Sequence, residues 1–176
     1  MIHLRAFEIF QLLVCELLMK RTFFLTVVLA LTSGSLLANE LDLAFSNTQG
    51  GMALGGGYTM KSSVRHGYGG HLRVVPENDD PEKLQTGLTV LGGHMKVYGS
   101  GGPLGWFMAA GASLLMIDPP FGDSETALGS SLGFGLVHRV GGSASVGVDL
   151  WHYQPWTGDE GRGGFSYMSL VVSLGV

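Results

Sequence analysis

Residues 167–176 read YMSLVVSLGV, and this closing stretch of the chain decides which fold the sequence predicts. Every second residue in it is aliphatic or methionine, while the residues between them are mostly small or polar. Successive side chains of a strand point to opposite faces, so the pattern predicts a strand with one unbroken apolar face. That apolar face consists of Met168, Leu170, Val172, Leu174 and Val176.

The same alternation returns in seven segments upstream, which brings the number of predicted strands to eight. Most of these segments are close in length to the roughly 9–11 residues with which a tilted strand crosses a bilayer. The segments are 40–46, 52–60, 67–75, 85–98, 106–116, 127–138 and 144–153.

The fourth of these segments changes parity halfway along. Leu88 and Val90 share one face, whereas Met95 and Val97 belong to the other. The pair Gly92-Gly93 lies between them, and one extra residue in a strand shifts every later side chain to the opposite face. We therefore expect a β-bulge at these glycines that restores the register.

The chain is poor in charge for its apolar content. Hydrophobic residues make up 45% of the 176 residues and charged residues 14%, whereas soluble domains average about 25% charged residues. Beyond residue 38, no apolar run approaches the roughly 18–20 residues of a membrane helix. These features fit a barrel whose outer surface meets lipid, with a glycine-rich soluble β-protein as the alternative. The net charge of −4 leaves no basic stripe for a nucleic-acid partner.

The connections between the predicted strands differ in length and charge. Three turns assigned to the inner, periplasmic side are short: 61–66, 99–103 and 139–142. Three of the four outer connections are longer and acidic: 76–84, 117–126 and 154–164, with 47–51 as the short one. An even number of strands with this asymmetry is typical of outer-membrane barrels. We therefore expect residues 39–176 to form an all-β, eight-stranded, antiparallel, up-and-down transmembrane barrel.

Residues 19–38 have the order of a secretory signal peptide. Lys20 and Arg21 precede an apolar helical stretch, which is followed by a run of small residues. We expect cleavage between Ala38 and Asn39. This cleavage would remove the single cysteine, Cys15, and a chain without thiols suits export through an oxidising periplasm.

Residues 1–18 do not follow that order, since they read as an apolar helix that carries both acidic and basic residues. Our hypothesis is that translation begins at Met19 and that residues 1–18 are a misassigned extension. A membrane anchor and a lipoprotein signal ending at Cys15 are the alternatives; the acidic residues count against the anchor, and Val14 counts against the lipoprotein signal.

The smaller and more polar face of the predicted strands contains the charged residues Asp42, Arg73 and Asp149. We expect them to point into the lumen and to form a buried ion network, which would plug a narrow barrel rather than open a pore. Aromatic residues near strand ends also predict an interfacial girdle. They are Tyr98 and Trp106 at an inner turn, and Tyr153, Trp156 and Phe165 at an outer loop.

His152 is the strongest candidate for a catalytic residue, near the outer end of the seventh predicted strand. Some eight-stranded barrels are enzymes that act on lipid A, and the deacylase type carries a His-x-Ser pair near this place in the chain. Such chemistry needs a histidine base, a serine nucleophile and an orienting carboxylate. Gln154 stands in place of the serine, and Asp149 falls on the opposite face of the strand. We therefore expect an interfacial histidine rather than a catalytic one.

No metal or cofactor site is predicted. Four scattered histidines share no ligand spacing on a common face: His66, His71, His94 and His138. The acidic loop 76–84 could bind a divalent cation weakly, but a solvated loop is the simpler interpretation. The glycines of 99–105 have the wrong spacing for a nucleotide-binding loop, and Pro103 interrupts them, so a tight hairpin is expected.

In its glycine-rich alternating strands and apolar terminal strand, the chain resembles small outer-membrane barrels, and among these the YfaZ-like family. The similar features are ELDLAFSN at 40–47, GGGY at 55–58 and the glycine-rich central hairpins. The terminal strand looks like the signal read by the barrel-assembly machinery, although it ends in Val176 rather than in an aromatic residue.

The resemblance covers residues 39–176 and implies a monomer that meets outer-membrane lipid and lipopolysaccharide. It also implies Sec export, the barrel-assembly machinery and no cofactor. The expected function is a non-enzymatic envelope-structural or surface-interaction role. A lipid A-modifying enzyme that uses His152 and a narrow channel are the alternatives.

Overall fold

The computed structural model describes residues 39–101, 104–158 and 163–176. Two predicted segments, the extension 1–18 and the signal peptide 19–38, lie outside the described residues, and so does the Ala38 side of the expected cleavage site. Within the described ranges, no helix is long and apolar enough to cross a bilayer.

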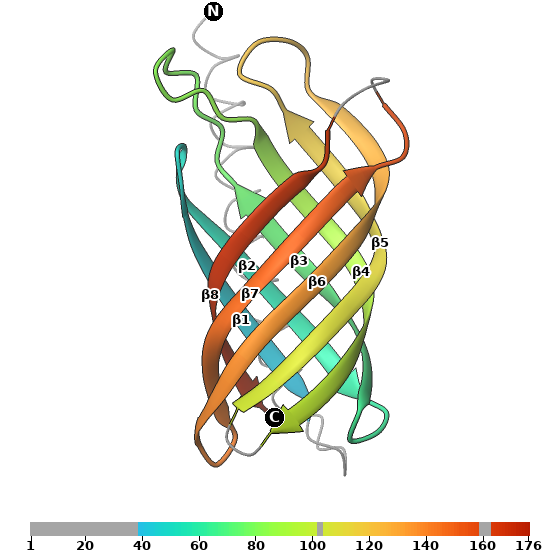
Figure 1. Ribbon diagram of the computed structural model, residues 1–176. Coiled ribbons are helices and arrows are strands. Elements are labelled where there is room, and N and C mark those ends of the chain that lie inside the picture. Colours follow the sequence, from blue (N-terminus) through green and yellow to red (C-terminus); the bar gives the residue numbers. More distant parts are fainter. Residues whose placement is uncertain (1–38, 102–103, 159–162) are drawn as a thin grey trace, which may run out of the picture. The chain divides into compact units, whose positions relative to one another are not determined.

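The described residues form eight strands that close into one antiparallel barrel, as predicted (Figure 1). Each strand pairs with its neighbours in sequence, and β1 pairs with β8 to close the wall. The connectivity is therefore up-and-down. The strands are β1 (Glu40–Thr48), β2 (Gly51–Lys61), β3 (His66–Val75), β4 (Gly87–Gly101), β5 (Leu104–Asp118), β6 (Glu125–Gly141), β7 (Ala144–Pro155) and β8 (Phe165–Gly175).

The expected β-bulge at Gly92-Gly93 is wrong. The pairing of β4 with β3 and with β5 runs through both glycines without a shift of register. Leu88 and Val90 therefore point into the barrel and are fully buried, whereas Met95 and Val97 point outward. The prediction failed because it assumed that the inner face is small or polar along the whole strand. The inner face in fact becomes apolar toward one end of the barrel. Among the described strand pairs, the irregular register lies between β6 and β7, at Arg139/Gly141.

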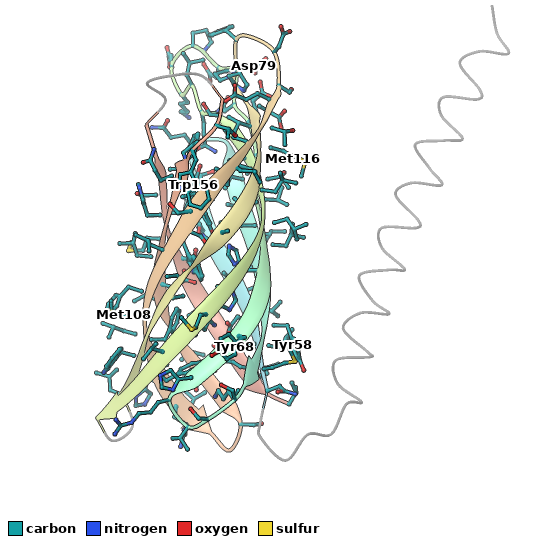
Figure 2. All side chains as sticks on the ribbon, turned by 90° about the vertical axis from the view of Figure 1, so that its right-hand side faces the viewer. Tyr58, Tyr68, Asp79, Met108, Met116 and Trp156 are labelled. Carbon is teal, nitrogen blue, oxygen red and sulfur yellow. The ribbon has the colours of Figure 1, made fainter. Side chains whose placement is uncertain are left out.

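The outer surface of the barrel carries a belt of exposed apolar side chains, and every strand contributes to it. Figure 2 shows such side chains projecting away from the wall, Met108 and Met116 among them. In water this surface would cost about 25 cal/mol for each Å² of apolar area, whereas hydrocarbon accepts it without penalty. One example from each strand, in chain order, is Phe45, Leu54, Leu72, Leu91, Met108, Leu132, Leu150 and Leu170.

The two ends of the barrel differ in their connections. At one end, β3 and β4 are joined by residues 76–86 and β7 and β8 by residues 156–164. At the other end, the connections are the short segments 62–65, 102–103 and 142–143. The long end carries acidic loop residues such as Asp79 (Figure 2). Gln85 ties the loop of β3 and β4 to the short turn of β1 and β2, because its Nε2 donates to Thr48 Oγ1 at 3.0 Å.

Candidate functional site

The inner face of the barrel holds a cluster of charged side chains near the short turns. Lys96 of β4 is buried and forms ion pairs with Glu40, at 3.2 Å from Nζ to Oε1, and with Asp42. Lys61 of β2 pairs with the other oxygen of Glu40 at 3.1 Å. The Lys96 ammonium also lies 4.6 Å from the centre of the Phe107 ring, a cation–π distance. The cluster therefore compensates each buried charge with at least one opposite charge.

Sequence reasoning did not identify Lys96, although a signal was present. Lys96 lies between Met95 and Val97, two residues of the lipid-facing surface. A lysine in the middle of a membrane-crossing strand is strongly disfavoured on the lipid side. Its side chain therefore had to point inward, and an inward lysine needs carboxylate partners.

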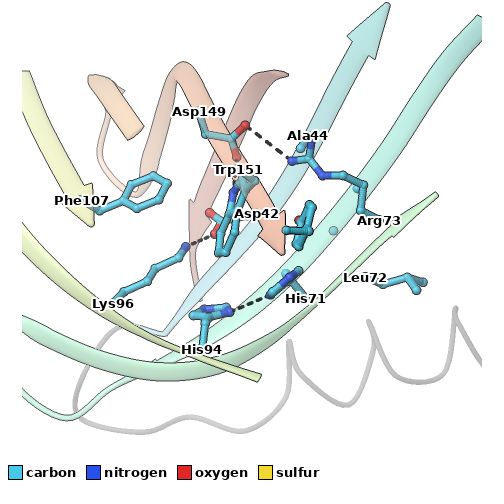
Figure 3. Close-up of a pocket in the computed structure, with 14 residues that line it drawn as sticks. Asp42, Ala44, His71, Leu72, Arg73, His94, Lys96, Phe107, Asp149 and Trp151 are labelled. Atoms are coloured by element: carbon cyan, nitrogen blue, oxygen red, sulfur yellow. Dashed lines mark hydrogen bonds and ion pairs between the residues drawn. The ribbon is translucent and has the colours of Figure 1, made fainter. Parts of the chain in front are cut away.

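A second cluster lies farther along the lumen, toward the long loops. Arg73 Nη2 lies 3.6 Å from Asp149 Oδ1, and Arg73 Nη1 donates to Ser169 Oγ at 2.6 Å. Trp151 Nε1 donates to the other oxygen of Asp149 at 3.0 Å. Of the three charged residues predicted to meet in the lumen, Arg73 and Asp149 lie together, whereas Asp42 pairs with Lys96 (Figure 3).

Two histidines lie between the charged clusters and contact each other. His71 Nδ1 and His94 Nδ1 are 3.1 Å apart, so one imidazole donates a hydrogen bond and the other accepts it (Figure 3). His94 Nε2 bonds Thr59 Oγ1 at 3.1 Å, and the His71 ring lies 4.5 Å from the ring of Trp151. Sequence reasoning treated these histidines as separate because the scattered histidines show no ligand spacing on a shared face of one strand. They meet because β3 and β4 are neighbours in the wall.

The described residues contain no group of three or more side chains that could hold a metal ion. The other two histidines of the scattered set, His66 and His138, are exposed. The His71–His94 pair is part of the polar network of the lumen through its own hydrogen bond and the bond from His94 to Thr59.

A small cavity of about 30 Å³ lies among the two charged clusters and the histidine pair (Figure 3). A polar cavity of this size holds one or two water molecules. His71 Nε2 is buried and has no hydrogen-bond partner in the protein, and the same is true of Asp42 Oδ1. Water in this part of the lumen would satisfy both atoms.

Next to the long loops, the lumen changes from polar to apolar. Val75 and Leu88 flank the loop of β3 and β4, and Ile117 and Ala127 lie at either side of the loop of β5 and β6. They pack into one buried core with inward-facing residues of the adjacent strands. We call this group the outer apolar cluster: Val75, Leu88, Val90, Leu115, Ile117, Ala127 and Tyr153.

His152 lies on the outer surface of the barrel, near the long loops and half-exposed. Its Nδ1 is 2.9 Å from Oγ of Ser166, a residue of the neighbouring strand β8. Sequence reasoning missed this serine because it searched along β7 rather than across the sheet. Asp149 points into the lumen, and in the described part of the chain no carboxylate hydrogen bonds to His152. Among the residues that the structure describes, the pair therefore has a base and a hydroxyl but no orienting acid.

The predicted aromatic girdle is partly wrong. Trp106 and Trp156 face outward and are exposed, as an interfacial residue should be. Tyr98, Tyr153 and Phe165, however, have the inward parity of their strands and pack against the core. Lys61 lies over the Tyr98 ring at 4.9 Å. All five aromatic residues were predicted to belong to the girdle because they lie near strand ends. Whether a side chain points outward or into the lumen depends instead on whether its position in the strand is an outward or an inward one.

Four residues of the predicted apolar face, Met168, Leu170, Val172 and Leu174, point outward from β8, and Val176 follows the end of that strand. Met168 and Leu170 are 72% and 67% exposed, and Val172, Leu174 and Val176 are half-exposed. β8 pairs with β7 over its outer part and with both β7 and β1 over its inner part, where it closes the barrel.

Comparison with known proteins identifies the fold. No protein-family description matches the chain, and no curated protein matches it in sequence. Among solved structures, the N-terminal β-barrel domain of Pseudomonas aeruginosa OprF aligns with a TM-score of 0.60 and 10% identity. That alignment covers 78% of this chain and 96% of the OprF domain. The corresponding values for Neisserial surface protein A are 0.58 and 11%, over 80% of this chain and 96% of that one.

The Yersinia pestis outer membrane protein Ail, in a phospholipid bilayer nanodisc, aligns with a TM-score of 0.51 and 11% identity, over 78% and 98% of the two chains. At these identities the similarity establishes the fold alone. The chain therefore has the architecture of small eight-stranded outer-membrane barrels.

Proposed function

We propose that this chain is a non-enzymatic integral outer-membrane protein with an envelope-structural or surface-interaction role. The observation that carries the proposal is a closed barrel with an apolar belt outside and a filled lumen inside. Such a barrel can lie in lipid, and its interior is too crowded for a substrate. The acidic loops at the long end are then the parts available to a partner.

The proposal includes the route and the surroundings of the protein. A signal peptide at 19–38 would send the chain to the Sec machinery, and β8 would be read by the barrel-assembly machinery. The mature barrel would lie as a monomer among outer-membrane lipid and lipopolysaccharide. Similarity of the fold to outer-membrane proteins supports this location, and the narrower resemblance to the YfaZ-like family is part of the proposal.

The test is expression in a Gram-negative host with the native leader, followed by two measurements on the outer membrane. We expect the mass profile of lipid A to be the same with and without the protein. We also expect the purified barrel to produce no conductance steps in planar bilayers. A changed lipid A profile would contradict the non-enzymatic role, and discrete steps would favour a channel.

A second candidate, a lipid A-modifying hydrolase, has one specific observation in its favour. The His152–Ser166 pair offers a base and a hydroxyl at 2.9 Å on the lipid side of the wall. If this pair were catalytic, the host's lipid A would change in mass, and either His152→Ala or Ser166→Ala would abolish the change. Gln154→Ala would serve as the control, since Gln154 contacts the backbone of Pro155 rather than His152.

A further inference from the structure

The lumen has two regions of different chemistry along its length. The inner and central parts hold ion pairs, two histidines and several hydroxyl groups. Near the long loops, each of the strands β3 to β7 contributes at least one inward-facing residue to the outer apolar cluster. The boundary is sharp on β5, where Ser113 faces the polar part and Leu115, two residues later on the same face, belongs to the cluster.

The outer apolar cluster is deeply buried. Its members are at most 2% exposed, and the cavity of the lumen is lined by residues of the polar part, with Tyr153 at the boundary. An ion entering such a layer would lose its hydration and would find the Tyr153 hydroxyl as the one polar side-chain group of the cluster, which costs many kcal/mol. Hydrophobic constrictions close pores by excluding water in this way.

The polar part has the opposite character. Ser113 Oγ, Ser131 Oγ and His71 Nε2 are buried there and have no hydrogen-bond partner in the protein. Water satisfies groups of this kind. Two of them lie beside the outer apolar cluster: Ser113 precedes Leu115 on the inner face of β5, and Ser131 of β6 is paired with Tyr153 of β7.

We propose that the outer apolar cluster, rather than the ion pairs, is the barrier that makes the barrel impermeable to ions. The water of the lumen is then confined to the small cavity of about 30 Å³ beneath this cluster. This inference rests on the proposed function, in which the wild-type barrel does not conduct.

The first experiment removes the ion pairs of Lys96 and Arg73 and leaves the cluster intact. Asp42, Arg73, Lys96 and Asp149 are all replaced by serine, which removes two positive and two negative charges together. Folding of each variant is checked by gel mobility before and after boiling, and the folded barrel is placed in planar bilayers. We expect no conductance steps, because the cluster still closes the lumen. Steps from this variant would overturn the proposal.

The second experiment adds Leu88→Ser and Leu115→Ser to the same background, which places hydroxyl groups in the outer apolar cluster. We expect discrete conductance steps, and their absence would equally overturn the proposal. The matched control is Val171→Ser in that background, since Val171 is an equally buried residue of β8 outside the cluster. This control should produce no conductance steps.

A single conservative variant keeps the test available if the multiple variants do not fold. Asp149→Asn removes the charge partner of Arg73 while keeping an oxygen for the Trp151 hydrogen bond. We expect this variant to produce no conductance steps in planar bilayers, and discrete steps would contradict the proposal. Steps from the wild-type barrel would instead overturn the proposed function, so the two failures are distinguishable.

Discussion

A lysine buried in a narrow barrel is costly unless carboxylates surround it, and Lys96 has two such partners, Glu40 and Asp42. Replacing Lys96 by methionine would leave both carboxylates with less compensation. We expect Lys96→Met to lower the free energy of unfolding by about 3–5 kcal/mol, measured by urea titration of the folded band on gels. Lys83→Met, in an exposed loop, is the control and should leave the midpoint unchanged.

The Arg73–Asp149 pair permits a test of coupling between single residues. Asp149→Asn leaves the Arg73 guanidinium without its counter-charge, so we expect a lower urea midpoint. Adding Arg73→Gln removes the unpaired charge. The loss in free energy of unfolding of the double variant should therefore be smaller, by at least about 0.5 kcal/mol, than the sum of the losses of the two single variants. Strictly additive losses would mean that the two side chains do not interact in the folded barrel.

At the scale of strands, close contacts between neighbours depend on glycine. A Cβ at Gly111 of β5 would overlap the backbone oxygen of Gly93 on β4, and a backbone atom cannot move aside without breaking the pairing. We expect Gly111→Ala to reduce the folded fraction strongly in gel-mobility assays. The matched control is Gly93→Ala, whose Cβ would meet its nearest neighbour at 3.9 Å. Equal folding of the two variants would show that β4 and β5 pair differently.

The lipid-facing surface of β8 gives a second prediction at this scale. Leu170 is 67% exposed on the outer face, and a charge there would have to enter hydrocarbon. We expect Leu170→Arg to destabilise the barrel by about 2–4 kcal/mol, the cost near the middle of a bilayer. Ser166→Arg, on the same face but beside the long loops, should cost much less. The measurement is the urea midpoint of each variant in lipid vesicles, and similar costs would place β8 outside the bilayer.

The strands also show which features of the fold could be predicted from the sequence and which could not. Alternation predicts strands well because the period of a strand is built into the backbone, and β8 followed its pattern without exception. Contacts across the sheet depend on register, which the sequence of one strand does not reveal. The contacts of His71 with His94 and of His152 with Ser166 were therefore not predicted. In β4 the pattern itself misled, because Leu88 and Val90 serve the interior rather than the lipid side.

At the scale of the whole molecule, the barrel combines an apolar exterior with an interior that is polar in one part and apolar in the other. A soluble barrel would have a polar exterior, so the belt is the feature that requires lipid. The closed wall, in which β1 pairs with β8, leaves no long open edge of the sheet in hydrocarbon. The account as a whole therefore depends on one claim, that this closed barrel is inserted in the outer membrane.

The most direct test of that claim is the gel mobility of the outer-membrane fraction, compared before and after boiling, when the chain is expressed in a Gram-negative host with its native residues 1–38. Closed barrels in lipid resist detergent until they are heated, so we predict a species in that fraction whose migration changes on boiling. A single band in the soluble periplasm, with the same mobility before and after boiling, would contradict the account.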